Sequence, residues 1–79
     1  MTMRLDALPV GRAARVSSVD AAGSMHRRLL DLGFTDGALT RCVYVNPSGN
    51  PRAYAVRGTV IALRNADARA VGLREEDEA

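Results

Sequence analysis

The stretch of residues 25–37 limits most strongly how this chain can fold. It contains a short amphipathic helix, a helix stop and a turn in immediate succession. At 100° per residue, Met25, Leu29 and Leu32 fall on one narrow face of the helix. Gly33 is the expected residue after the last helical turn, because glycine takes positive φ without steric cost. The stretch therefore predicts one helix that packs through a single apolar stripe and ends at Gly33.

Five further segments have the alternation or apolar content of short β-strands. They cover residues 14–18, 39–45, 52–56, 59–63 and 70–73. Residues 46–51 are expected to form a hairpin loop, since two prolines fix φ and Gly49 relaxes the chain. Single helical turns are expected at 6–8 and 66–69. Short strands joined by tight turns favour a small β-barrel over an open sheet, because closure removes edges that so short a chain cannot cover.

The two tyrosines bear on a nucleic-acid alternative. Small barrels bind RNA by stacking bases on aromatic rings in a basic groove, and Tyr44, Tyr54 and Phe34 are the aromatic residues present. However, Phe34 is expected to fold back on Leu29 after the helix stop. The tyrosines are expected to face each other as a cross-strand pair beside the hairpin. We therefore predict no nucleic-acid partner, with a nucleic-acid-binding barrel kept as an alternative.

Length and composition limit the chain to one small domain. Its 79 residues predict a single domain over 1–74, followed at 75–79 by an acidic tail that is expected to be disordered. The single cysteine cannot form an internal disulfide. No segment approaches the roughly 20 apolar residues of a membrane span, and no signal-peptide core is present. We therefore expect a cytoplasmic protein without direct membrane insertion.

The sequence contains no recognisable catalytic or metal-binding constellation. Ferrous iron prefers imidazole, carboxylate or thiolate ligands that converge at one point. His26 and Cys42, the only residues of their types, fall on different predicted elements without a second ligand three or four residues away. Neither a nucleophile with its base nor a phosphate-binding glycine loop is present. We expect no enzyme activity, no cofactor and no metal site; a direct metal sensor is kept as an alternative.

The order and spacing of the short motifs resemble the FeoA family, small cytosolic proteins of bacterial ferrous iron uptake. The resemblance extends over residues 5–73. The motifs are Leu5-x-x-Leu8-x-x-Gly11, Arg27-Arg-Leu-Leu-Asp-Leu-Gly33, Gly37 before a strand, Pro47-x-Gly-x-Pro51, Ile61-Ala-Leu-Arg64 and Asp67-Ala68. Arg52 departs from the family pattern, which has an apolar residue there. Either the barrel is looser at this point or Arg52 lies along the surface with its stem buried.

The resemblance implies a small SH3-like β-barrel of about five strands, with the helix inserted after the first strand. It also implies a non-enzymatic accessory or regulatory protein that docks on the cytosolic GTPase region of a FeoB-type membrane transporter, with weak self-association compatible with this role. Transition metal binding enters only as a family-level property. Because the same fold occurs as the C-terminal domain of iron-dependent repressors, a free-standing metal-sensing domain is the remaining alternative.

The flank of the helix is the predicted partner-binding surface. Leu30 lies about 100° from the apolar stripe, so it points to the side of the barrel when the stripe points inward. Together with Leu32 or Phe34, it is expected to line a shallow apolar groove whose rim is Arg27 and Arg28. Two alternatives stay open: the apolar N-terminal lead-in covers Leu30, or the two arginines form an ordinary solvated helix face.

Overall fold

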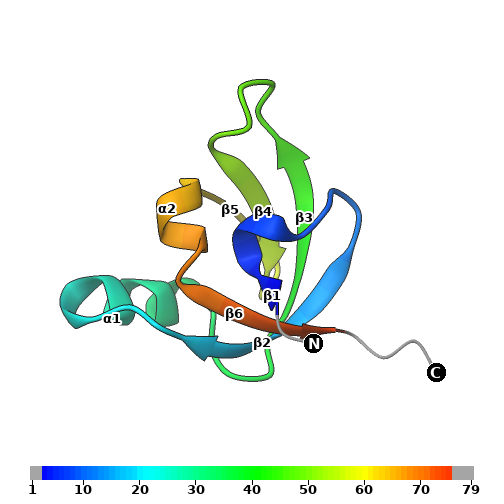
Figure 1. Ribbon diagram of the computed structural model, residues 1–79. Helices are drawn as coiled ribbons and strands as arrows, with labels where there is room; N and C mark the ends of the chain where they lie inside the picture. The colour runs from blue at the N-terminus through cyan, green and yellow to red at the C-terminus, as the bar shows by residue number, and fades with distance from the viewer. Residues whose placement is uncertain (1–2, 76–79) are drawn as a thin grey trace.

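The computed structural model describes residues 3–75, which form one curved antiparallel sheet with one main helix (Figure 1). The strand order is β1-β6-β2-β3-β4-β5. The elements in chain order are β1 (Met3–Arg4), the 3₁₀ helix η1 (Leu5–Ala7), β2 (Ala13–Val19), α1 (Gly23–Leu32), β3 (Leu39–Val45), β4 (Arg52–Val56), β5 (Thr59–Leu63), α2 (Asn65–Ala68) and β6 (Val71–Glu75). The predicted mostly-β fold with one main helix is confirmed. A sixth strand, β1, is added because Met3 and Arg4 pair with β6.

The sheet is open in its hydrogen bonding, so the expectation of closure by strand pairing is wrong. Its two edges, β1 and β5, do not pair with each other. Side chains of β4 instead reach the backbone of η1 and the residue after it. The Tyr54 hydroxyl donates to the Leu5 carbonyl at 3.1 Å, and the Arg52 guanidinium donates to the carbonyls of Asp6 and Leu8 at 2.5 and 2.8 Å. Arg52 is thus a half-buried tie between β4 and the N-terminal segment, placed deeper than a surface arginine.

The core takes residues from nearly every element and holds α1 by one stripe. Leu29 is the buried residue of α1, while Met25 and Leu32 pack against the core from the side. Gly33 ends the helix at φ +115°, and the Phe34 N–H donates to the Leu29 carbonyl at 3.1 Å. The predicted stripe and helix stop are therefore confirmed. The largest buried side chains are Tyr54, Phe34, Leu5, Leu8, Leu29, Leu73, Val16, Val56 and Val71.

A register shift in β3 separates the two tyrosines. Cys42 pairs with Tyr54, but the register shifts before the next pair, so Tyr44 stands opposite Ala53. The extra residue in β3 turns the following side chains to the other face. Tyr44 is consequently 55% exposed, whereas Tyr54 is fully buried. The expected tyrosine cross-strand pair is therefore wrong.

Candidate functional site

The flank of α1 is a cationic surface beside one half-buried leucine. Arg27 and Arg28 are exposed, and Leu30 is half-buried. Arg27 pairs with Asp31 at 3.5 Å, and both side chains are more than two-thirds exposed, so this pair adds little stability. Within residues 3–75, Arg28 has no ion pair or side-chain hydrogen bond. Figure 1 shows α1 at one side of the sheet, near β2.

The structure separates the three apolar residues predicted for this flank. Phe34 is fully buried and belongs to the core, so its inclusion in the accessible surface is wrong: the helix stop that places it also turns it inward. Leu32 is half-buried and packs against the core. Leu30 is half-buried without being among the side chains that pack against the core cluster. We define the α1 flank as Arg27, Arg28 and Leu30.

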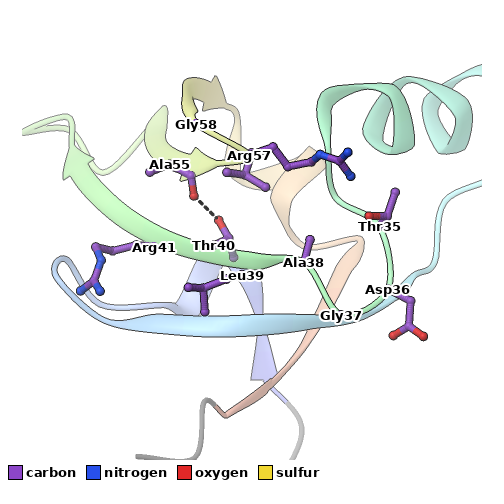
Figure 2. Close-up of a pocket in the computed structure, with 11 residues that line it drawn as sticks. Thr35, Asp36, Gly37, Ala38, Leu39, Thr40, Arg41, Ala55, Arg57 and Gly58 are labelled. Carbon is purple, nitrogen blue, oxygen red and sulfur yellow. Dashed lines mark hydrogen bonds between the residues drawn. The ribbon is translucent and has the colours of Figure 1, made fainter.

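A groove of about 620 Å³ lies next to the C-terminal end of α1, and sequence analysis did not identify it (Figure 2). Residues 35–41 and 55–58 line it. The first of these segments leaves α1 and becomes β3; the second is the end of β4 and its turn into β5. Thr40 Oγ1 donates to the Ala55 carbonyl at 3.0 Å and fixes the two strands below the groove.

Arg57 connects this groove with the helix stop. Its aliphatic stem lies against Gly33, where an added Cβ would be 2.8 Å from Arg57 Cδ. Arg57 has φ +52° and Gly58 has φ +79°, as a tight two-residue turn between β4 and β5 requires. Figure 2 shows the Arg57 guanidinium directed toward the segment of Thr35. This turn also forms a wall of the groove, a role that sequence analysis did not predict.

The groove is lined by both apolar and positively charged side chains. Its lining includes the apolar Leu39 and Ala55 together with the exposed Arg41 and Arg57. Arg41 donates to the Gly11 carbonyl at 2.6 Å, whereas Arg57 makes no ion pair with any residue of the described range. Asp36, the groove's one acidic residue, contacts Arg74 at 3.4 Å. Apolar and cationic groups in one groove would suit a protein surface that carries apolar and acidic groups.

The two residues considered as metal ligands lie apart. Cys42 is buried in β3, and His26 is half-buried on α1. Across residues 3–75 there is no group of three or more His, Cys, Asp or Glu side chains placed to hold a metal ion. Nor is any helix in this range long and apolar enough to cross a membrane.

Comparison with known proteins gives a family match and close structural neighbours. The sequence pattern of the FeoA domain matches residues 3–75. Iron(II) transport protein A of Clostridium thermocellum is 29% identical, with a TM-score of 0.88; the match covers 92% of this chain and 45% of that one. FeoA of Stenotrophomonas maltophilia, solved in complex with zinc, is 36% identical with a TM-score of 0.82, and the match covers 91% and 89% of the two chains.

The Stenotrophomonas protein is described as an SH3 domain protein and a candidate ferrous iron transport activating factor. That description agrees with the predicted SH3-like fold. A manganese-dependent transcriptional repressor also shares the fold, with a TM-score of 0.84 over 95% of this chain and 42% of its own. Its 18% identity supports a common architecture alone. The search of curated proteins found no match.

Proposed function

Because the chain belongs to the FeoA family, we propose that it is a non-enzymatic accessory protein of ferrous iron uptake in the bacterial cytoplasm. Its partner in this proposal is the cytosolic GTPase region of a FeoB-type transporter. The match to an iron(II) transport protein and to a candidate transport activating factor supports the pathway. The protein would contribute a binding surface, while the chemistry of nucleotide hydrolysis belongs to the transporter.

The observation that carries the proposal is the α1 flank. The helix is anchored by one buried residue, Leu29, and presents a half-buried Leu30 one turn after the exposed Arg27, with the exposed Arg28 further round the helix. An apolar side chain with a charged rim is the usual make-up of a modest protein interface. The groove at 35–41 and 55–58 begins just after the helix stop at Gly33 and offers a second surface for the same partner. Docking would therefore bury Leu30 and set Arg27 and Arg28 against acidic groups of the partner.

A binding module can alter the transporter only if it binds one conformation of the GTPase region better than another. We therefore expect different affinities for the GDP-bound region and for the region loaded with a non-hydrolysable GTP analogue. A tenfold difference corresponds to about 1.4 kcal/mol of bias between the two states. Equal affinities would leave a docking protein with no thermodynamic means of regulating the transporter.

The structure offers no set of exposed aromatic rings, within residues 3–75, on which nucleic-acid bases could stack. Of the three aromatic residues in the chain, Phe34 and Tyr54 are buried. Tyr44 is thus the single exposed aromatic ring. Stacking of successive bases needs several exposed rings along a groove, so the structure favours the protein-binding proposal.

The test is the affinity of the full chain and its Leu30→Asp variant for the purified GTPase region, measured by titration calorimetry. We expect the variant to bind at least tenfold more weakly, because a carboxylate would replace an apolar contact at the centre of the surface. Val10→Asp is the matched control: Val10 is 56% exposed and lies outside α1 and the groove. Equal losses in both variants, or unchanged binding by folded Leu30→Asp, would refute the α1 flank as the docking surface.

A further inference from the structure

The edge strand β5 is the second surface that the fold leaves without a partner. β5 (Thr59–Leu63) is hydrogen-bonded to β4 on one side and is the last strand of the sheet. The other edge, β1, is only two residues long, which is a common protection against unwanted pairing. β5 has five residues, with neither charge nor proline, and it contains Val60 at 63% exposure. It therefore lacks the usual protections of an edge strand.

The outward backbone groups of β5 can be identified from its register. The two-residue turn 57–58 makes Val56 and Thr59 the pair that closes the hairpin. In an antiparallel ladder every second residue turns its N–H and C=O toward the partner strand, and the others turn theirs away. Val60 and Ala62 are therefore the residues whose backbone groups face outward. Outside the ladder with β4, no hydrogen bond within residues 3–75 involves the backbone of residues 59–63.

Two exposed arginines without ion pairs within residues 3–75 bound β5 in the sequence, and the stem of the first, Arg57, lies against Gly33 at the turn end of the strand. Arg57 precedes the strand across the turn, and Arg64 follows it directly. Both side chains are exposed, and neither makes an ion pair with another residue in the described range. Between them lies a neutral strand with exposed Val60 and Ala62. A complementary segment would be extended and apolar in its middle, with carboxylates near its ends.

A second copy of this chain fits the edge poorly. Antiparallel pairing of β5 with itself about Ile61 would place Arg64 opposite Gly58 of the other copy, next to that copy's Arg57. Each end of such a pairing would then carry two cations of like sign, which destabilises cross-strand neighbours. The charges therefore favour a different protein segment as the occupant.

We propose that β5 is a strand-addition site, which binds an extended, acid-flanked segment of a partner protein as a seventh strand. Backbone hydrogen bonds from Val60 and Ala62 would hold the segment, as in other cases where a peptide extends an exposed sheet edge. Arg64, which directly follows the strand, would select for an acidic flank, and Arg57 would add positive charge at the turn end. This site is separate from the α1 flank, so Leu30→Asp leaves it intact.

The test uses a synthetic probe, the acetylated and amidated octapeptide Glu-Glu-Val-Thr-Ile-Val-Glu-Glu, titrated into the ¹⁵N-labelled full chain at low salt. We expect amide shifts concentrated at residues 59–64 and slower solvent exchange of the Val60 and Ala62 amides. The same peptide with Lys in place of Glu is expected to bind at least tenfold more weakly. Absent shifts, or equal binding of the two peptides, would overturn the proposal.

Two variants separate the backbone contribution from the charges. Ala62→Pro removes an outward N–H that is not part of the ladder, so it should abolish binding, while Ala62→Thr keeps that N–H and should bind. If the proline variant does not fold, Arg64→Glu serves as the test and is expected to weaken binding of the acidic peptide at least fivefold. Arg28→Glu, which reverses a charge on α1, is the control and is expected to leave this binding unchanged. Protection of Val60 and Ala62 that grows with protein concentration without peptide would assign the edge to a second copy and overturn the proposed occupant.

Discussion

The buried hydroxyl of Tyr54 provides a prediction with a characteristic pH signature. Tyr54 is fully buried and donates to the Leu5 carbonyl at 3.1 Å. Tyr54→Phe removes this bond and leaves the carbonyl without its donor, which costs about 1.5 kcal/mol at pH 7. For a domain of this size we expect Tm to fall by about 6–12 °C.

The order of stabilities should reverse at high pH. Burial raises the pKa of Tyr54 to about 12, and the nearby Arg52 guanidinium opposes the shift. The unfolded chain releases this proton near pH 10, so the folded protein binds more protons between pH 10 and 12 and loses stability as pH rises through that window. Two pKa units correspond to about 2.7 kcal/mol. The phenylalanine variant escapes this loss, so the two stability curves should cross near pH ~11.

Urea unfolding followed by far-ultraviolet circular dichroism, from pH 7 to 11.5, measures both effects. The chain suits this experiment because all eleven of its basic side chains are arginine and no lysine titrates in the window. Tyr44→Phe is the matched control: it removes an exposed phenol and should leave the alkaline loss in place. A difference between wild type and Tyr54→Phe that stays constant from pH 9 to 11.5 would refute the reasoning.

Two further stability predictions follow from the backbone and from an exposed ion pair. Gly33→Ala should lower the free energy of unfolding by about 1–2 kcal/mol because the site has positive φ, and by more because the new Cβ would lie 2.8 Å from the Arg57 stem. Gly49→Ala is the control: its site has φ +90° with open space around it, so thermal unfolding of this variant measures the conformational cost alone. The hydrogen bond from Arg4 lowers the pKa of Asp20 below its ordinary 3.8, so this carboxylate adds stability above pH 4 that is lost as pH falls through the lowered value. Asp20→Asn should therefore flatten part of the acid limb of a stability-against-pH curve, and an unchanged acid limb would contradict the assignment.

The parts of the fold that sequence analysis predicted are those with local causes. The stop at Gly33 follows from glycine's access to positive φ, and the stripe of α1 follows from helical periodicity. The tyrosine pairing was not predictable in this way, because the register shift in β3 depends on the match with β4. The open sheet was not predictable for a similar reason: it depends on which strands lie at the edges, β1 and β5, and not on the local sequence of any one strand.

The candidate site was predictable in its helical part alone. Arg27, Arg28 and Leu30 belong to one helix, and their accessible positions follow from the phase of the stripe. The groove depends on two segments, 35–41 and 55–58, that are distant in sequence and meet through strand pairing. The apolar composition of β5 likewise indicates a strand without indicating that it lies at an edge. Position within the sheet, rather than local sequence, decides which of these residues are accessible.

The most direct test of the docking proposal is a footprint of the unlabelled GTPase region of a FeoB-type transporter on the ¹⁵N-labelled chain. The proposal predicts that resonance shifts or broadening centre on residues 27–30 and extend to the groove at 35–41. A footprint confined to surfaces away from both, on a complex shown to form, would contradict the assignment of the α1 flank as the docking surface.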